Sequence, residues 1–387
     1  MTFNYVGPVN TTGYGVASIG YLGELLKLDN TIGFKPIGQI QGQPPIEGGA
    51  IDQATKNFDP SKPTFCFWHL SDIPNQIEEC TGRKVGMTTF EVGSLKVNEI
   101  EALTKLDTMC TASTWGKEVL EKYYTKGVHV IPHAFKFSEV ASLPAYDVNQ
   151  DSIPVWEAAI APTKLDPETL ILSTAGKYES RKGHPELIDA CIEIGKEKPI
   201  VLVSFVFNPF IHDNFPYGFI NSRFMYPVHT KSGIKVFRKG KFLLILMPPT
   251  KEKQELHAAL SKADFFVSPS KGEGWNLPLF EMMSYGMPCI TTLNTAHTDY
   301  CTTDNCIEVH PDKEHELIVA NDGQFFHGDS NWYNITIDSL KQAIEDALEA
   351  KKQKEFLSEM GKRATQATSG FSWQKSAKMI VNLMKQN

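Results

Sequence analysis

Apolar segments of strand length alternate with segments of helical periodicity along most of the chain, and this alternation starts twice. The first series begins with an expected strand at 3–6, a glycine-containing loop and a helix after residue 15, and continues to an expected strand at 128–132. The second series runs from a strand at 169–175 to one at 288–292. Such alternation is typical of a parallel sheet with helices on both faces. The sequence therefore predicts an α/β fold with two Rossmann-like, doubly wound domains.

The two series also fit the size of the chain, because 387 residues exceed what one hydrophobic core usually holds. Residues 137–168 contain four prolines and little periodicity, which indicates a linker. We predict an N-terminal domain over 1–150 and a C-terminal domain over 165–370. Ligands of such sheets bind at the carboxyl ends of the strands, so a cleft between the two halves is the expected place for chemistry.

Composition and charge exclude several classes of protein. The net charge of -7 argues against a surface built as a whole for nucleic acid or anionic lipid. Seven cysteines, an odd number, lie mostly in apolar stretches and suit reduced, buried thiols. The sequence shows no apolar run of membrane-spanning length and no signal-peptide pattern at its start, so we expect a cytoplasmic protein.

The most informative segment is 268–286, in which a strand end, a polar loop and a helix follow one another. Loop and helix start present backbone N–H groups at the positive end of a helix dipole, which suits a diphosphate or a sugar hydroxyl. Asn276 is the expected helix cap, and Pro278 lies in the first turn. Two carboxylates, Glu273 and Glu281, flank the site and can accept hydrogen bonds from hydroxyls. Taken singly, each is as well explained as a capping or solvated carboxylate.

The spacing Glu-x7-Glu, with Gly274 after the first Glu and Tyr-Gly-Met-Pro after the second, resembles the signature of retaining GT-B glycosyltransferases of family 4, group 1. The resemblance implies that Glu273 contacts hydroxyls of the donor sugar and that Glu281 holds the ribose of the nucleotide. It also implies that the backbone of Gly274, Trp275, Asn276 and Leu277 approaches the sugar and phosphates, and that a terminal helix at 372–387 joins the N-terminal domain.

A second loop, 173–183, places cations at the expected carboxyl end of a strand: Lys177, Arg181 and Lys182. Cations there can neutralise a leaving diphosphate as its charge grows. By itself, a lysine-rich loop is more often solvated surface. In the family that the chain resembles, equivalent cations bind the diphosphate, and Lys177 stands where that family commonly has Arg.

The N-terminal loop supplies Gly13 and Gly15, which permit close approach of backbone to a ligand. His69 and Glu91 end expected strands of the N-terminal domain, and the resemblance implies that a His lies near the C6 hydroxyl of the donor; His133 is a weaker candidate. Glu273, His69 and Lys182 are the predicted catalytic residues. No residue is a candidate covalent nucleophile, and the resemblance implies a front-face retaining mechanism. The chain contains no Asp-x-Asp, so we expect neither a metal nor another cofactor.

The predicted function is transfer of a hexose from a nucleotide-sugar, with UDP as the expected nucleotide, to a hydroxyl acceptor with retention. The sequence departs from the family at 208–240, where aromatic residues alternate with cations such as Lys235, Arg238 and Lys239. This composition suits either a flap or dimer contact, or a surface for nucleic acid, so one alternative acceptor is a hydroxymethylated pyrimidine in DNA. Two alternatives from other classes are a non-catalytic nucleotide-sugar-binding protein and a pyridoxal-dependent sugar phosphorylase of the same architecture.

Overall fold

The computed structural model describes residues 2–42, 44–135, 165–207, 217–224, 227–231, 233–250, 253–320 and 330–386. The chain divides into two compact units. Unit 1 comprises Met1–Lys136, Glu273–Leu277 and Gly370–Asn387, and unit 2 comprises Phe137–Gly272 and Pro278–Ser369. The expected linker at 137–168 lies largely outside the described residues. Each unit contains one main sheet with helices on its two faces, so the predicted α/β fold of two Rossmann-like, doubly wound domains is confirmed.

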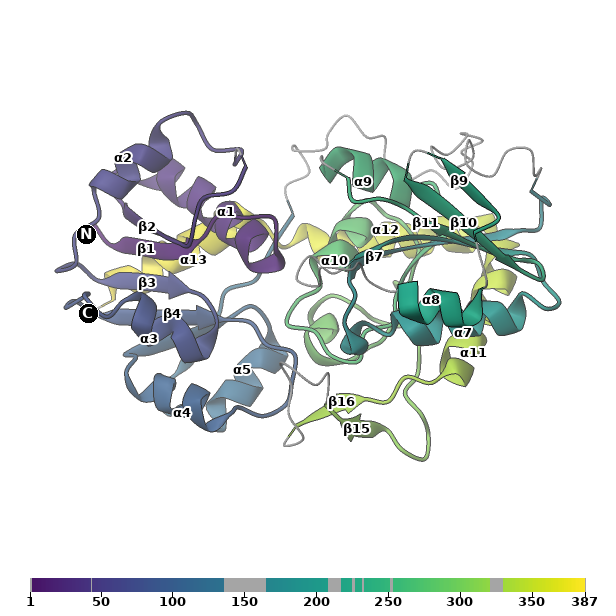
Figure 1. Ribbon diagram of the computed structural model, residues 1–387. Coiled ribbons are helices and arrows are strands. Elements are labelled where there is room, and N and C mark those ends of the chain that lie inside the picture. Colours follow the sequence, from purple (N-terminus) through teal and green to yellow (C-terminus); the bar gives the residue numbers. More distant parts are fainter. Residues whose placement is uncertain are drawn as a thin grey trace. The chain divides into compact units, whose positions relative to one another are not determined.

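Unit 1 is built on a six-stranded, fully parallel sheet (Figure 1). Its order is β2-β1-β3-β4-β5-β6. The strands are β1 (Asn4–Pro8), β2 (Gly33–Ile37), β3 (Thr64–Phe67), β4 (Lys84–Thr88), β5 (Thr108–Thr111) and β6 (Val128–Val130). Because β2 and β3 flank β1 on opposite sides, the order reverses between β1 and β3. A doubly wound sheet binds its ligand outside the carboxyl ends of the strands at such a reversal.

The helices of unit 1 are α1 (Gly13–Leu28), α2 (Ala50–Lys56), α3 (Ile73–Gln76), α4 (Val97–Thr104), α5 (Thr114–Glu121) and α13 (Trp373–Lys385). Helix α13 packs along α1, although about 345 residues separate them in the chain. Gly20 of α1 lies flat against the indole of Trp373, since a Cβ at Gly20 would be 2.4 Å from that ring. Arg83 donates from Nη1 to the carbonyl oxygen of Leu383 over 3.0 Å and so attaches the end of α13 to the sheet.

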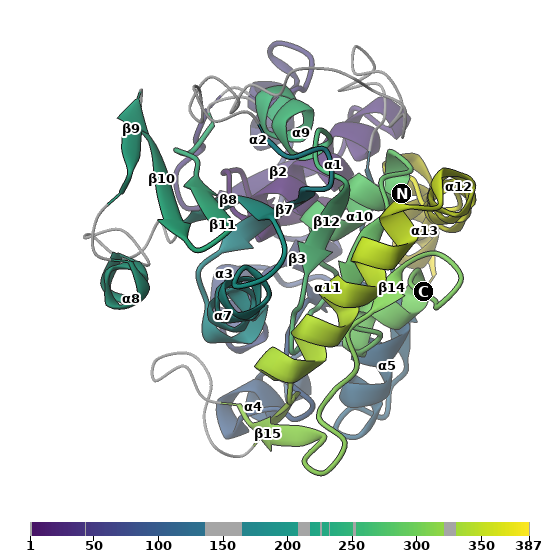
Figure 2. The same ribbon diagram turned by 90° about the vertical axis from the view of Figure 1, so that its right-hand side faces the viewer.

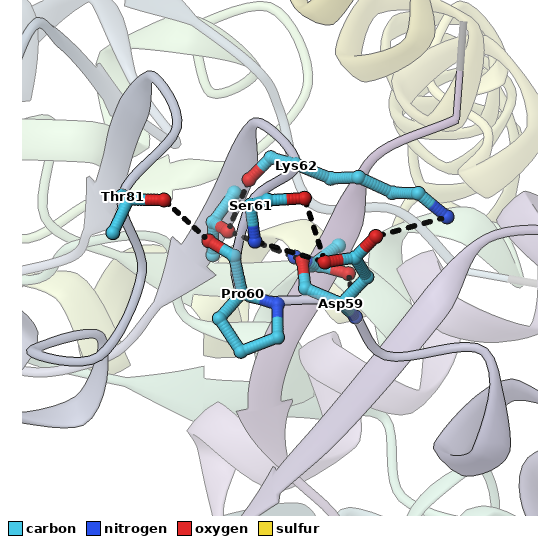
Figure 3. Close-up of polar contacts among 7 residues, drawn as sticks. Asp59, Pro60, Ser61, Lys62 and Thr81 are labelled. Carbon is cyan, nitrogen blue, oxygen red and sulfur yellow. Dashed lines mark hydrogen bonds and ion pairs between the residues drawn. The ribbon is translucent and has the colours of Figure 1, made fainter.

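A tight turn leads into β3 and shows how polar side chains fix the start of a buried strand (Figure 3). The carboxylate of Asp59 accepts the amide of Ser61 over 3.0 Å and the hydroxyl of Ser61 over 2.7 Å. These bonds lower the pKa of Asp59. The carbonyl oxygen of Pro60 accepts the amide of Thr81 at 2.8 Å, and Asn4 of β1 donates to the carbonyl oxygen of Asp59 at 2.7 Å. The turn is thereby tied to two neighbouring segments of the unit.

Unit 2 is built on an eight-stranded sheet of order β14-β13-β12-β7-β8-β11-β10-β9. Its parallel strands are β7 (Leu170–Lys177), β8 (Ile200–Phe207), β11 (Phe242–Leu246), β12 (Phe265–Ser268), β13 (Cys289–Thr291) and β14 (Ile307–Glu308). Strands β8 and β12 flank β7, so the reversal of strand order lies between β7 and β12. The loops that leave these two strands are the two that the sequence singled out.

Strands β9 (His229–Lys231) and β10 (Ile234–Lys239) differ from the parallel sheet that the sequence predicts. They pair antiparallel with each other and with β11, and so extend one edge of the sheet with part of the 208–240 segment. A separate pair, β15 (Leu317–Val319) and β16 (Asn331–Tyr333), is also antiparallel. Antiparallel strands can be joined by short turns, whereas parallel ones need a crossover, so strand-helix alternation does not reveal them.

Helices cover both faces of the unit 2 sheet (Figures 1 and 2). On one face lie α7 (His184–Ile194), α8 (Tyr217–Arg223) and α11 (Ile337–Lys351), whose apolar side chains form a core with the strands. On the other lie α9 (Lys253–Leu260), α10 (Leu277–Ser284) and α12 (Lys354–Ser369). Helices α9 and α10 lie side by side, since their side chains are hydrogen-bonded to each other.

Candidate donor-binding site

The two loops at the reversal of the unit 2 sheet are bonded to each other. Arg181, in the loop after β7, donates from Nη1 to the carbonyl oxygen of Gly272 over 3.1 Å. In return, the backbone amide of Lys271 donates to the carbonyl oxygen of Arg181 over 2.7 Å. The 173–183 loop and the start of the 268–286 segment therefore meet at the carboxyl edge of β7 and β12, where a doubly wound sheet binds its ligand.

Within the first loop, Glu179 lies between two cations. Lys177 Nζ is 2.7 Å from Oε1 of Glu179, and Arg181 Nη2 is 2.8 Å from Oε2. Burial raises the pKa of Glu179, but the charges of Arg181, Lys177 and Lys182 outweigh that effect, so the pKa is lowered. The carboxylate is thus ionised at neutral pH and offsets part of the positive charge of the loop. Lys177 retains an exposed fraction of 38%, and Lys182 is half-buried.

Arg181 differs from its two lysine neighbours because its guanidinium is buried, with 5% of its side chain exposed. Its guanidinium contacts Glu179 and the carbonyl oxygen of Gly272. These contacts give Arg181 a role in holding the loops together, a role that the sequence did not indicate. Contact of Arg181 with a donor stays a prediction, as it does for Lys177 and Lys182.

The second loop is held from two further sides. Lys271 is buried with 8% of its side chain exposed, and its Nζ is 2.6 Å from Oε1 of Glu186 on α7. Its carbonyl oxygen accepts the amide of Tyr333, which ends β16, over 3.0 Å. Gly183 has φ 69°, and a Cβ there would be 2.4 Å from the carbonyl oxygen of Pro269. Only glycine satisfies both the left-handed conformation and this close approach.

Glu281, the second carboxylate of the predicted signature, is buried in the middle of α10. Lys253 of α9 forms an ion pair with Oε1, and His257 of α9 contacts Oε2 from Nε2 at 2.7 Å. Burial raises the pKa of Glu281, but the Lys253 ammonium and the hydrogen bond with His257 lower it below its ordinary value. His257 Nδ1 is in turn 3.2 Å from the hydroxyl of Tyr285. The sequence predicted Glu281 as a site residue but none of these three partners.

The segment Glu273–Leu277 belongs to unit 1, whereas the residues on either side of it belong to unit 2. Glu273 is buried, and Gly274 lies against the residues that follow β4, where a Cβ would be 3.0 Å from Thr89. Trp275 is also buried, and its ring lies 5.3 Å from that of Phe371. Side-chain packing therefore fixes this stretch. At Gly274, Thr89 already lies as close to the backbone as we predict for a ligand.

Asn276 directly precedes α10, as expected for a cap residue, but its φ of 75° is left-handed. An N-cap residue normally has extended backbone angles, so Asn276 holds the predicted cap position with an unusual backbone conformation. Non-glycine residues seldom adopt a positive φ, and Asn is among those that do so most readily. Leu277 is the first residue of α10. Roles of Trp275, Asn276 and Leu277 in donor binding stay predictions.

The two glycines of the N-terminal loop differ. Gly15 packs on its own loop, because a Cβ would be 2.2 Å from the side-chain oxygen of Asn10. Gly13, the first residue of α1, has open space around its Cβ position. Of the two, the geometry leaves room for a ligand at Gly13, while Gly15 is explained by the turn itself.

His69 and His133 lie in different environments at the carboxyl edge of unit 1. His69 follows β3, is exposed, and its ring lies 4.5 Å from that of Tyr14. His133 is buried, its Nδ1 is 2.7 Å from the hydroxyl of Tyr21, and burial lowers its pKa to about 3. A neutral core histidine therefore describes His133, whereas His69 stays available as a predicted donor contact. Glu91 is half-buried three residues after β4.

Tyr14 is a residue of this edge that the sequence did not single out. Its hydroxyl donates to the carbonyl oxygen of Thr89 at 2.6 Å and accepts the amide of Thr89 at 3.0 Å. Burial raises its pKa to about 12. Tyr14 thereby joins the first turn of α1 to the residue that follows β4.

The cations of the 208–240 segment do not form one cluster. In the β10–β11 register, Lys235 lies opposite Leu246 and Lys239 opposite Phe242, so they mark the two ends of β10. Arg238 lies on the opposite face from both, because side chains alternate along a strand. Lys239 also donates to the carbonyl oxygen of Arg223. Strand β10 therefore does not bring Lys235, Arg238 and Lys239 together on one surface for nucleic acid.

Two features are absent from the described residues. Over that part of the chain, no helix is both long enough and apolar enough to span a bilayer. Among the same residues, His, Cys, Asp and Glu side chains form no group of three or more that could hold a metal ion. Independence from metal and cofactors stays a prediction.

Comparison with known proteins agrees with this architecture. Residues 244–322, which include both Glu273 and Glu281, match the family model described as glycosyl transferases group 1. No curated protein sequence matches the chain. The matched segment is similar to glycosyl transferases group 1, and the fold of the two units is of the GT-B class. The resemblance that the sequence showed is confirmed at this level.

Among solved structures, sucrose-phosphate synthase from Thermosynechococcus elongatus is similar at 14% identity with a TM-score of 0.63, covering 100% of this chain and 98% of that one. HepE of Anabaena, in complex with UDP and glucose, is 11% identical with a TM-score of 0.60, covering 100% and 99%. TarM is 13% identical with a TM-score of 0.51; the match covers 86% of this chain but 57% of TarM. At these identities, the similarity shows the fold alone.

Proposed function

We propose that this protein is a hexosyltransferase that uses a nucleotide-sugar donor, with UDP as the nucleotide, and transfers the sugar to a hydroxyl acceptor with retention and without a metal. The observation that carries the proposal is the reciprocal bonding of Arg181 with Lys271 and Gly272, which brings the cationic loop to the carboxylate-bearing segment. The match to group 1 and the UDP and glucose bound to HepE support the choice of donor.

In the proposed reaction, Lys177 and Lys182 face the diphosphate and stabilise the charge that develops as the bond to the sugar breaks. Glu281 is ionised and accepts hydrogen bonds from the ribose hydroxyls. Glu273 accepts from hydroxyls of the hexose, and His69 contacts the sugar. The leaving phosphate accepts the proton of the attacking acceptor hydroxyl on the same face, so the new glycosidic bond keeps the configuration of the old one. The protein contributes orientation and charge.

The binding part of this proposal is tested by calorimetric titration with UDP, GDP and ADP. Replacing Glu281 by Gln removes an ionised acceptor and is expected to weaken UDP binding about 10- to 100-fold, the usual effect of a charged hydrogen bond. Glu193→Gln, on the exposed side of α7, is the matched control and should bind as the unaltered protein does. Equal affinity of both variants would contradict the assignment of Glu281.

Turnover separates an enzyme from a non-catalytic binding protein. Release of UDP from UDP-sugars is measured against a panel of sugar, lipid and hydroxymethylated-DNA acceptors, with and without EDTA, and the anomeric configuration of the product is read by NMR. We expect turnover that EDTA does not reduce and a product that retains the donor configuration. Tight binding without turnover for every acceptor would favour the binding-protein alternative.

A further inference from the structure

Helix α9 brings two side chains onto the Glu281 carboxylate. Lys253 and His257 lie four residues apart and so share one face of the helix. Lys253 forms its ion pair with Oε1, and His257 Nε2 lies 2.7 Å from Oε2. His257 has 1% of its side chain exposed and Glu281 6%, whereas Lys253 has 36%. His257 is thus the interior partner of the carboxylate, and Lys253 is the partner nearer to solvent.

The proton positions in this cluster follow from the chemistry of its members. An ionised carboxylate only accepts hydrogen bonds, so the contact at Oε2 requires a hydrogen on Nε2 of His257. In the neutral imidazole, Nδ1 is then an acceptor, and the Tyr285 hydroxyl, 3.2 Å away, can donate to it. Burial and the nearby Glu281 charge raise the pKa of Tyr285, so its hydroxyl keeps its proton. The order Tyr285 to His257 to Glu281 gives each of these two contacts one donor and one acceptor.

Such a chain limits the rotation of the carboxylate. Each carboxylate oxygen has about two acceptor directions. His257 uses one direction of Oε2, and Lys253 uses one of Oε1, which leaves one on each oxygen. Two neighbouring hydroxyls on a five-membered ring can donate to both remaining directions only if the orientation of the carboxylate plane is fixed. A misoriented carboxylate weakens both hydrogen bonds together.

We propose that His257 is a positioning residue that fixes the Glu281 carboxylate and thereby gives the site its preference for nucleotides with both ribose hydroxyls. The inference rests on the proposed role of Glu281 and adds the residues that make this carboxylate selective. Tyr285 supports His257 from the side remote from the carboxylate. Lys253 supplies charge but, being partly exposed, does not fix the orientation.

The test measures the ratio of two dissociation constants by calorimetry, for UDP and for 2′,3′-dideoxy-UDP. The unaltered protein should prefer UDP at least tenfold. In His257→Phe, UDP binding should weaken about tenfold while dideoxy-UDP binding is unchanged, so the ratio collapses. His257→Gln keeps an N–H donor at the Nε2 position and should restore part of the ratio, and Tyr285→Phe should lower it less. Glu255→Gln, exposed on the same helix, is the control and should leave the ratio intact.

A merely structural role of His257 would lower thermal stability and weaken both ligands alike, leaving their ratio unchanged, and this result would overturn the inference. A full ratio in both His257→Gln and Tyr285→Phe would overturn it too, even if His257→Phe failed to fold. If the unaltered protein binds UDP and dideoxy-UDP equally, the proposed role of Glu281 itself is wrong. If the protein binds GDP or ADP instead of UDP, the same ratio of dissociation constants is measured for that nucleotide and its 2′,3′-dideoxy form.

Discussion

Arg181 and Gly272 are joined side chain to backbone across the reversal of the unit 2 sheet, and the neighbouring Lys271 amide returns a bond to the Arg181 carbonyl oxygen. The guanidinium that makes this contact is buried beside Glu179. An arginine in a basic loop thus serves the geometry of the loop, while contact of the neighbouring lysines with a diphosphate stays a prediction. The following predictions separate these two kinds of residue.

Arg181→Ala should reduce the free energy of unfolding by about 3 kcal/mol, since it leaves the half-buried Glu179 and the Gly272 carbonyl oxygen without this partner. Urea denaturation followed by circular dichroism measures the change. Lys196→Ala, at a cation with 63% of its side chain exposed, should alter stability by no more than about 0.5 kcal/mol. A loss below about 1 kcal/mol in Arg181→Ala would show that the contacts of Arg181 with Glu179 and Gly272 contribute little to stability.

Lys182→Ala should weaken UDP about tenfold and leave uridine binding unchanged, because the removed charge acts on the diphosphate that uridine lacks. Calorimetric titration with each ligand measures this, again with Lys196→Ala as the matched lysine control. An equal loss for uridine would mean that the variant disturbs the pocket instead of the phosphate contact.

Gly183→Ala should reduce the free energy of unfolding by about 2 kcal/mol or more, because φ 69° and the Pro269 carbonyl oxygen at 2.4 Å both oppose a Cβ. Gly13→Ala is the contrasting variant. The Cβ position of Gly13 is open and the residue starts a helix, so stability should stay the same or rise slightly. Any loss of donor binding in folded Gly13→Ala would then report a ligand close to that backbone, and destabilisation there would contradict the open site.

The buried His133 should make the protein less stable in mild acid. Its pKa is about 3 in the folded state against an ordinary value of about 6.5, so between these values the unfolded chain binds a proton that the folded chain excludes. Stability is therefore unaffected above about pH 6.5 and falls as the pH drops below it. From this group alone, we expect a loss of about 2 kcal/mol between pH 8 and pH 5.

His133→Phe should reduce that pH-dependent loss by a similar amount, whatever its effect on stability at pH 8. Urea denaturation at pH 8 and pH 5 for both proteins measures the difference. His310→Phe is the control, because His310 is largely exposed and should leave the slope nearly unchanged. If the free energy of unfolding of His133→Phe falls as much between pH 8 and pH 5 as that of the unaltered protein, groups other than His133 cause the acid sensitivity.

Much of the fold follows from local pattern, and the exceptions have physical reasons. The apolar runs that become β7, β8 and β12 are long or uniformly buried, so their period and length identify them. Strand β2 contains Pro36, so its run does not resemble an apolar strand. Its strand conformation comes from pairing with β1, which is remote in the sequence.

Some residues of the candidate site could be predicted from the sequence, and others could not. Glu281, Lys177 and Lys182 belong to motifs with fixed spacing, and such spacing can be found in a single sequence. His257 stands in an ordinary helical pattern 24 residues before Glu281, and Lys271 pairs with Glu186 across 85 residues. Pairings of this kind depend on which helices lie side by side, and neither composition nor period specifies that. Asn276 was predicted as a cap, but its left-handed backbone conformation was not.

The position of α13 bears on how the protein is made. Unit 1 begins with the first strand but includes the helix near the end of the sequence, which packs on α1 and is fastened by Arg83. During synthesis, the six strands of this unit emerge long before that helix does, so the groove that Trp373 fills on α1 is exposed to water while the ribosome translates unit 2. Of the two units, unit 1 therefore begins first and is completed last, and a nascent chain stalled before residue 370 would display an apolar surface.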